Sequence, residues 1–401
     1  MKVLQLCHKM PFPLHDGGAF SLYHNALGLI SVGGDIKVLA INTPRNWIDV
    51  NEIPDDFRIK TRFECYAVDT RIRPVKAFIN LFSDKSYFVE RFWSVRWNSK
   101  LIQVLKNEEF DIIQLEHLYM CLYIQTIRKY SNAKLILRPQ NVENEVWERL
   151  LEGSLNPIKK IYLQIATNRL RKYEKQAVLE VDGIIAISGK DAQTFSDYTP
   201  KTPVIKIPIG FDFSKINSYN IDKQFEIFPV FYHLGSMDWF PNFQGIKWFI
   251  EEVIPFIKID YPEFVFCIAG KNMSPWFLKQ QDKSLIVEGE VKESLLYHED
   301  KAVMIVPLLS GSGLRAKIIE GMALGKTIIS TTIGAEGIPY TDQENILIAN
   351  TREEFAIQIK KCRDSKEFCK KIGENAKMLA LENYDCIKTA ASIIEFYQSL
   401  T

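Results

Sequence analysis

Several features that mark secreted, membrane-spanning or metal-binding proteins are missing from this sequence. The seven cysteines are scattered, odd in number and form no CxxC pair, which predicts reduced thiols and no zinc site. No apolar run approaches the ~18 residues of a membrane span, and Lys9 interrupts the opening apolar run too early for a signal peptide. No Asp-x-Asp pair occurs, and the six histidines do not cluster at ligand spacing. We therefore expect a cytoplasmic, soluble protein that needs no metal.

A strong charge of one sign is also missing. The formal net charge of the 401-residue chain is only +1, which gives no argument for nucleic-acid binding. Hydrophobic residues make up 47% and charged residues 25% of the chain, as in ordinary globular proteins. The length exceeds that of one ordinary core, so we expect two domains of roughly 200 residues.

The apolar runs predict two successive rounds of alternating strands and helices. Repeated alternation of this kind predicts doubly wound, mostly parallel sheets of α/β type. The expected strands of the first round are 2–8, 35–41, 111–115, 134–137, 183–187 and 204–208. Those of the second are 230–235, 264–270, 284–289, 302–306 and 327–331, with an amphipathic helix at 242–257. We predict an N-terminal domain at 1–212, a C-terminal domain at 213–384 and a final helix at 385–401, with an active site between the domains.

The stretch "PLLSGSGLRAKIIEGMALGKTIISTTIGAEG" (307–337) carries the clearest chemistry. We expect a strand, a glycine loop, a helix that starts near Gly313 with Ser312 as its cap, and a second strand. Glycine at 311 and 313 would let a ligand approach the backbone at the positive end of the helix dipole. Lys317 and Glu320 would lie on the helix side opposite the apolar residues.

Such a helix suits a nucleoside diphosphate. Phosphates would meet the helix start together with Arg315 or Lys317, and a vicinal diol such as ribose would bind the Glu320 carboxylate. The alternative from these residues alone is a solvated helix with a Lys–Glu pair three residues apart.

Four ordered motifs make the whole chain resemble the family 4 glycosyltransferases, a large retaining class of GT-B fold. The motifs are the stretch from 311 to 338, "LGSMDWFPNFQGIKWFIEEVIP" (234–255), "LRPQNVENEVWERL" (137–150) and "MPFPLHDGGAF" (10–20). The resemblance implies two Rossmann-like domains, a C-terminal helix that packs back on the N-terminal domain, and transfer of a sugar from a nucleoside-diphosphate sugar.

For the donor site, the resemblance implies that Glu320 binds ribose hydroxyls. Ser312 stands where the family carries a second glutamate, and Ser236 and approximately Asn242 stand where it carries an arginine and a lysine. We infer that Arg315 and Lys317 supply the missing positive charge. The other expected donor-binding residues are Gly313, Leu314 and, in the loop "VEGEV" that cups the base, Gly289 and Val291.

For the N-terminal domain, the resemblance implies a loop at Gly17 and Gly18 near the donor diphosphate and acceptor. Gln140 stands where the family generally has a histidine near the reacting sugar, and it cannot take up a proton at neutral pH. Glu143 is a further catalytic candidate, although a carboxylate in a first helical turn is often a capping partner. The helix dipole with Arg315 and Lys317 would stabilise the departing diphosphate without a metal or other cofactor.

Two basic, aromatic-rich stretches, 71–97 and 158–176, predict a peripheral contact with anionic lipid at the inner membrane face. The alternative is that their aromatic residues fill the core. The expected function is sugar transfer to a hydroxyl of a saccharide or lipid-linked glycan, of the kind used in envelope polysaccharides such as capsule and lipopolysaccharide. The departures at Gln140, Ser312 and Ser236 leave open a catalytically weak or silent nucleotide-sugar-binding subunit, and a nonhydrolysing sugar-nucleotide epimerase would share the architecture.

Overall fold

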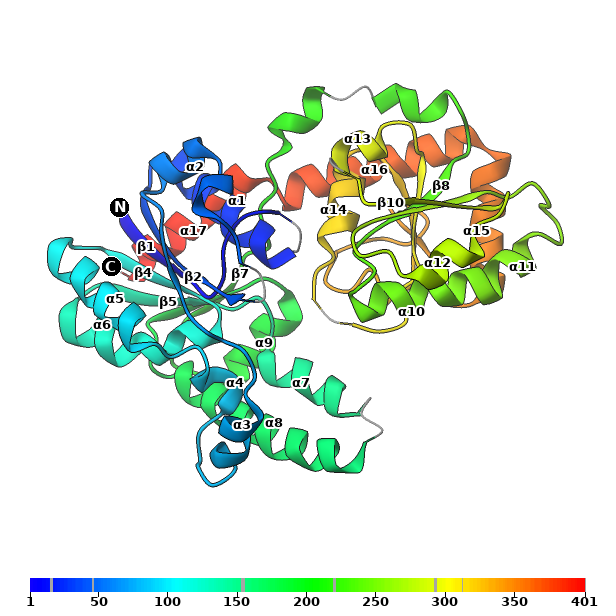
Figure 1. Ribbon diagram of the computed structural model, residues 1–401. Helices are drawn as coiled ribbons and strands as arrows, with labels where there is room; N and C mark the ends of the chain where they lie inside the picture. Colours follow the sequence, from blue (N-terminus) through cyan, green and yellow to red (C-terminus); the bar gives the residue numbers. More distant parts are fainter. Residues whose placement is uncertain are drawn as a thin grey trace. The chain divides into compact units, whose positions relative to one another are not determined.

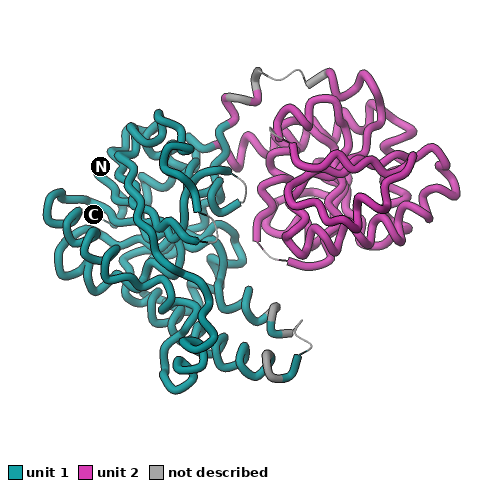
Figure 2. Tube along the Cα trace, in the orientation of Figure 1, with its two compact units in different colours: residues 1–212, 386–401 teal, residues 213–385 magenta. Residues whose placement is uncertain are grey.

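The structure is a computed structural model that describes residues 1–14, 17–44, 47–152, 156–218, 221–291, 294–311 and 313–400. The chain divides into two compact units (Figure 2). Unit 1 comprises Met1–Asp212 and Cys386–Thr401, and unit 2 comprises Phe213–Asp385.

Unit 1 is built on a seven-stranded parallel sheet in the order β3-β2-β1-β4-β5-β6-β7. In chain order the strands are β1 Lys2–Cys7, β2 Asp35–Asn42, β3 Glu64–Ala67, β4 Ile112–Glu116, β5 Lys134–Arg138, β6 Gly183–Ala186 and β7 Val204–Lys206. Its helices are α1 Gly17–Ser31, α2 Asp55–Lys60, α3 Pro74–Asn80, α4 Tyr87–Glu90, α5 Val95–Asn107, α6 Ile124–Tyr130, α7 Glu143–Glu152, α8 Pro157–Ala177, α9 Gly189–Tyr198 and α17 Cys386–Leu400, with short 3₁₀ helices η2 Val50–Glu52 and η3 Leu118–Tyr123. The sheet order reverses between β1 and β4, which is where ligands bind in folds of this type.

Alternate residues of each central strand enter two different cores. In β1, Leu4 and Leu6 join the core beneath α5, α6 and α8, whereas Val3 and Cys7 join the core beneath α1 and α17. Both faces of the sheet are therefore buried, and this explains why these strands are apolar runs rather than alternating patterns.

The C-terminal helix α17 returns to unit 1 and lies against α1 (Figure 1). Ile393 and Tyr397 are buried in the same core as α1, and the Tyr397 hydroxyl bonds Gln114 of β4. The prediction that this helix packs back on the N-terminal domain is confirmed.

Unit 2 carries a six-stranded parallel sheet in the order β10-β9-β8-β11-β12-β13. Its strands are β8 Phe231–Leu234, β9 Phe266–Ala269, β10 Leu285–Gly289, β11 Val303–Val306, β12 Thr327–Ser330 and β13 Leu347–Ile348. Its helices are α10 Phe240–Trp248, which continues through a π-helical turn Phe249–Val253 into α11 Ile254–Ile257, then α12 Pro275–Gln280, α13 Ser294–His298, α14 Ala316–Ala323, α15 Arg352–Asp364 and α16 Lys366–Asn383, after 3₁₀ turns at Phe213–Ser218 and Ile221–Phe225. The order reverses between β8 and β11. Two doubly wound parallel sheets were predicted, and both are present.

One expected boundary is wrong. The helix expected to start near Gly313 begins only at Ala316, and Arg315 is its N-cap residue. Gly311 and Gly313 have φ values of 108° and 83°, so the chain is outside the right-handed helical region until it has passed them. Ser312, the expected cap, lies outside the described residues.

Candidate functional site

In unit 2, the Lys317 side chain reaches the carboxyl end of the sheet at its point of reversal. Its Nζ donates to Asn242 Oδ1 at 2.7 Å and lies 3.1 Å from His233 Nε2. Asn242 in turn donates from Nδ2 to the Ser236 carbonyl at 2.8 Å. Three of the residues expected to bind the donor are thus joined, together with His233, which the sequence analysis did not single out.

A hydrogen bond to the neighbouring strand β11 fixes the tautomer of His233. Its Nδ1 lies 2.7 Å from the Ile305 carbonyl of β11, and a carbonyl can only accept, so Nδ1 carries the proton. Nε2 therefore offers its lone pair to Lys317. Burial, followed by the charge of Lys317, holds the pKa of His233 well below its usual value, so the ring is neutral.

Lys317 is an unusually acidic lysine. Burial, with the nearby positive charge of Arg315 as second cause, lowers the pKa of Lys317 to about 7. Gly235 leaves room for the group, because a Cβ there would collide with Lys317 Nζ and Asn242 Nδ2. The Lys317 amine is held by two acceptors and is only partly protonated near pH 7. An incoming anion would favour its charged form, so the group is well suited to bind one.

Arg315 is also within this unit but is more deeply placed. Its guanidinium lies 5.3 Å from the centre of the Trp239 ring, and Nη1 donates to the Gly313 carbonyl at 2.5 Å. The side chain is 5% exposed. Its positive charge contributes to the lowered pKa of Lys317.

Glu320, one turn further along α14, has different partners from Lys317. Its Oε1 accepts from the Ser294 hydroxyl at 2.7 Å, and Oε2 lies 3.9 Å from His298 Nε2. Burial raises the pKa of Glu320 and lowers that of His298 to about 3. A neutral His298 that accepts the Tyr232 hydroxyl at Nδ1 carries its proton on Nε2, which faces the carboxylate. The solvated Lys317–Glu320 pair considered above is therefore not the arrangement found.

The remaining donor-side candidates lie on loops of unit 2. Gly289 ends β10 with a φ of 74° and accepts the Gly270 amide at 2.7 Å through its carbonyl. Val291 and Leu314 are half-buried.

In unit 1, three groups converge at the start of α1, where Gly17 and Gly18 are the first two residues of the helix and not the loop expected before it. Gln140 Nε2 lies 3.4 Å from the Gly18 carbonyl. A Cβ at Gly18 would collide with Gln140 Oε1 and with Lys9 Nζ. Gly17 is the first residue of α1. Lys9 was not identified from the sequence as a site residue, although it lies two residues after β1, where the sheet order reverses.

Glu143 is the first residue of α7, and its side chain is not a capping partner. Oε1 accepts from His117 Nε2 at 2.9 Å and Oε2 from the Tyr119 hydroxyl at 2.9 Å. Burial favours the neutral acid, but His117 and Tyr119 outweigh it and lower the pKa of Glu143. The cap is supplied by Glu174 of α8, whose carboxylate accepts the amides of residues 143 and 144 at 2.8 and 3.1 Å.

Two histidines that the sequence analysis passed over lie beside this carboxylate. His8 and His117 directly follow β1 and β4, and their ring centres are 4.1 Å apart. His8 Nδ1 donates to the Glu116 carbonyl at 2.9 Å, and burial lowers its pKa well below the usual value. The available signal was positional: each histidine comes one residue after a buried strand.

Comparison with known proteins gives a family match for part of unit 2 and a fold for the whole chain. Residues 228–365 match the family described as glycosyl transferases group 1. An uncharacterized 44.6 kDa protein of the cps region of Klebsiella pneumoniae is 23% identical over 98% of this chain and 99% of that protein. Among solved structures, the sucrose-phosphate synthase of Thermosynechococcus elongatus is 14% identical with a TM-score of 0.69, covering 100% of this chain and 99% of that one. Anabaena Alr3699/HepE in complex with UDP is 13% identical with a TM-score of 0.65 over 100% of both chains. The predicted GT-B fold is confirmed.

Proposed function

We propose that this chain is a group 1 glycosyltransferase that moves a sugar from a nucleoside-diphosphate sugar to a hydroxyl of a saccharide acceptor, since residues 228–365 match that family. The observation that carries the proposal is the pair of held groups on α14. Lys317 is fixed by His233 and Asn242, and Glu320, one turn later, is fixed by Ser294. A cation for phosphate and a carboxylate for a vicinal diol then lie on one helix, within the segment that matches the family.

The donor is a UDP-sugar in this proposal. Anabaena Alr3699/HepE, which has the same fold, is known in complex with UDP and with UDP-glucose. Lys317 would meet the diphosphate, Arg315 would add positive charge from beneath the loop, and Glu320 would bind the ribose. Ser236 and Asn242 carry no charge. They would position Lys317 and would not take the place of the family's arginine and lysine at the phosphates.

Transfer proceeds with retention and without a metal. The bond from the sugar C1 to the diphosphate oxygen breaks on the same face on which the acceptor oxygen forms its bond to C1. The acceptor proton passes to the departing diphosphate oxygen, so no side chain needs to accept it. Gln140, held near Gly18, would then hydrogen-bond the sugar or the acceptor, and Lys9 would add a positive charge beside it.

The acceptor is a lipid-linked glycan of an envelope polysaccharide, and the enzyme works on the cytoplasmic side of the inner membrane. The full-length relative from a cps region supports a polysaccharide product. No helix within the described ranges has the length and hydropathy of a membrane span. In this proposal, contact with the acceptor is made at the membrane surface.

A second candidate is a nucleotide-sugar-binding subunit with little or no turnover. The specific observation is Gln140, which occupies the place of the histidine expected near the reacting sugar. Both candidates predict donor binding, but only the enzyme releases the nucleoside diphosphate, slowly even when water is the acceptor.

The test is thermal stabilisation of the purified chain by UDP, GDP, ADP, CDP and dTDP, followed by UDP release from UDP-sugars. A ligand present at 100 times its dissociation constant stabilises the protein by roughly 2.7 kcal/mol. We expect UDP to give the largest shift, and the Lys317→Ala and Glu320→Ala variants to lose most of it. If no diphosphate shifts the melting temperature, the donor site on α14 is wrong. Stabilisation without any UDP release would favour the silent subunit.

A further inference from the structure

One short segment of unit 1 exposes an unusual number of large apolar side chains. Within residues 72–82, the exposed fractions are 58% for Ile72, 71% for Val75, 63% for Phe78, 62% for Ile79 and 82% for Phe82. The segment includes α3, of which only Ala77 is buried. Single exposed apolar residues are normal, but five within eleven positions mark an interaction surface.

The structure separates this segment from the aromatic residues that follow it in the sequence. Tyr87, Phe88, Phe92 and Trp97 are buried, and the last three belong to the main core of unit 1. The stretch 71–97 therefore has two roles. Its second half fills the core, as the alternative interpretation of the sequence held, and its first half does not.

The exposed surface continues onto α8. Ile161 and Ile165 are 65% and 36% exposed, and they share a helix face with Arg169, because the three residues are spaced four apart. Arg169 donates to the Asn80 carbonyl at 2.8 Å and to the Leu81 carbonyl at 2.9 Å. Arg169 thus ties this face of α8 to the C-terminal end of α3, and the two helices are adjacent (Figure 1). We call the set Ile72, Val75, Phe78, Ile79, Phe82, Ile161 and Ile165 the apolar patch.

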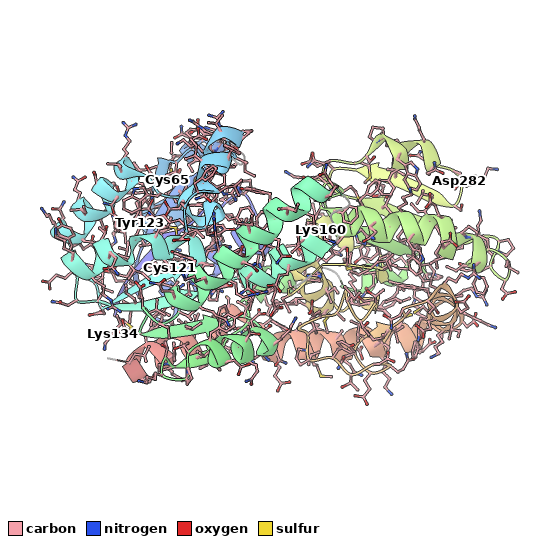
Figure 3. All side chains as sticks on the ribbon, turned by 90° about the horizontal axis from the view of Figure 1, so that it is seen from below. Cys65, Cys121, Tyr123, Lys134, Lys160 and Asp282 are labelled. Atoms are coloured by element: carbon pink, nitrogen blue, oxygen red, sulfur yellow. The ribbon has the colours of Figure 1, made fainter. Side chains whose placement is uncertain are left out.

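Positive charge surrounds the apolar patch. Residues 69–85 contain four lysines and arginines against two aspartates, and residues 157–177 contain six against one glutamate. Asp69 pairs with Arg71 and Arg73. Lys76 on α3 is exposed, and so is Lys160 near the start of α8 (Figure 3). Lys85 and Arg171 pair with Glu90 and Glu148, which lie outside the two ranges. The charge that remains on the two ranges after this pairing is positive.

We propose that the apolar patch is a docking surface for a lipid bilayer that contains anionic lipid. Apolar and aromatic side chains on short helices, flanked by lysine and arginine, are the composition of segments that lie in the headgroup region. The surplus of cations favours this partner over a second copy of the chain, whose identical patch would bring like charges together. The proposal goes beyond sugar transfer and does not depend on it.

The experiment is co-sedimentation of the full chain with vesicles. Vesicles of phosphatidylcholine with phosphatidylglycerol are compared with vesicles of phosphatidylcholine alone. The test variant is Phe78→Gln/Phe82→Gln. The matched control is Ile59→Gln/Val95→Gln, because Ile59 and Val95 are apolar residues of unit 1 that are 77% and 73% exposed. A charge variant, Lys76→Gln/Lys160→Gln, tests the electrostatic part.

The full chain and the control variant should bind the anionic vesicles, and the Phe78/Phe82 variant should bind about tenfold more weakly or worse. The charge variant should bind severalfold more weakly, and raised salt should have the same effect. Equal binding by the Phe78/Phe82 variant, or no binding by the unchanged chain, overturns the proposal. A dimer in solution that the Phe78/Phe82 variant dissociates, without vesicle binding, would show instead that the apolar patch is an interface between copies. Because UDP stabilisation is measured without vesicles, failure here leaves the donor site intact.

Discussion

Lys317 illustrates how one side chain can be tuned by residues that are distant in sequence. His233 is kept neutral by burial and by the charge of Lys317. Because its Nδ1 bonds the Ile305 carbonyl, its Nε2 presents a lone pair to the ammonium. Burial first, and then the positive charge of Arg315, disfavour the charged form of Lys317. The resulting pKa of about 7 means that the free protein holds a mixture of charged and neutral Lys317 at neutral pH.

This pKa predicts a pH dependence of donor binding. A nucleotide sugar is the better probe, because its diphosphate diester does not titrate near neutrality. Below pH 7 Lys317 is already charged, whereas above pH 7 binding must include uptake of a proton. The dissociation constant should therefore rise with pH above 7, by up to about tenfold per unit. Isothermal titration calorimetry from pH 6 to 9 measures the dissociation constant.

The matched control is Lys317→Arg, since an arginine stays charged throughout this range. Its dissociation constant should be independent of pH, whatever its absolute value. If the dissociation constants of the unchanged chain and of the variant rise equally with pH, the pH dependence comes from another group.

Gly18 allows a second prediction for a single residue. Gly18→Ala would push a methyl group against the ends of the Lys9 and Gln140 side chains. Because both side chains are flexible, the free energy of unfolding should change by less than about 1 kcal/mol. UDP release should nevertheless fall by at least about tenfold, since both groups would be displaced. Gly189→Ala is the control, because its Cβ would have only Lys206 Cδ near it, at 4.0 Å. Unchanged release by Gly18→Ala would remove Gln140 and Lys9 from the reaction.

Among the strands, the central ones were predicted because their burial is complete, whereas the edge strands β7 and β10 were predicted although they are partly exposed. The central strands of both sheets are covered on two faces, so each is a continuous apolar run that composition alone detects. The missed strands, Glu64–Ala67 and Leu347–Ile348, are short edge strands, and the first is mostly half-exposed, which removes that signal. The late start of α14 was missed because positive φ values at Gly311 and Gly313 are a property of the loop's fold, not of its composition.

The partners within each site could not be predicted in the same way. The sequence placed Lys317, Glu320, Gln140 and Glu143 near strand ends through spacing and family resemblance. The contacts of these residues come from other strands and helices, as with His233 from β8 and His117 after β4. Such pairings depend on strand order, which a single sequence does not reveal.

The helix α17 is the element whose loss should be most damaging to unit 1. The Tyr397 hydroxyl bonds the buried Gln114 side chain, so Tyr397→Phe leaves that amide oxygen without this donor and should cost about 1–2 kcal/mol in the free energy of unfolding. Tyr397→Ala should cost about 3–5 kcal/mol, because it also leaves a cavity.

Ile387→Ala is the control in the same helix, because Ile387 is 54% exposed. Its effect should stay within about 0.5 kcal/mol. Urea denaturation measures all three variants. A Tyr397→Ala effect no larger than that of the control would mean that α17 adds little to the stability of unit 1.

At the scale of the whole molecule, the chain leaves unit 1 after residue 212 and re-enters it at residue 386. The two crossing points are adjacent, because the Cys386 amide donates to the Phe211 carbonyl at 2.9 Å. Unit 2 is thus one uninterrupted segment inserted into unit 1, and unit 1 needs its last helix to complete the core around α1.

This connectivity predicts how the chain can be divided. Residues 213–385 alone should fold cooperatively and, since they contain Lys317 and Glu320, should still be stabilised by UDP. Residues 1–212 alone should aggregate or unfold, because the face covered by Ile393 and Tyr397 would be exposed. Residues 1–212 joined to 386–401 by a short Gly-Ser linker should fold, since the two ends already touch at Phe211. Circular dichroism and thermal denaturation of the three fragments test this, with full-length protein as reference. A folded 1–212 fragment would show that α17 is dispensable, and an unfolded 213–385 fragment would show that unit 2 depends on unit 1 for its stability.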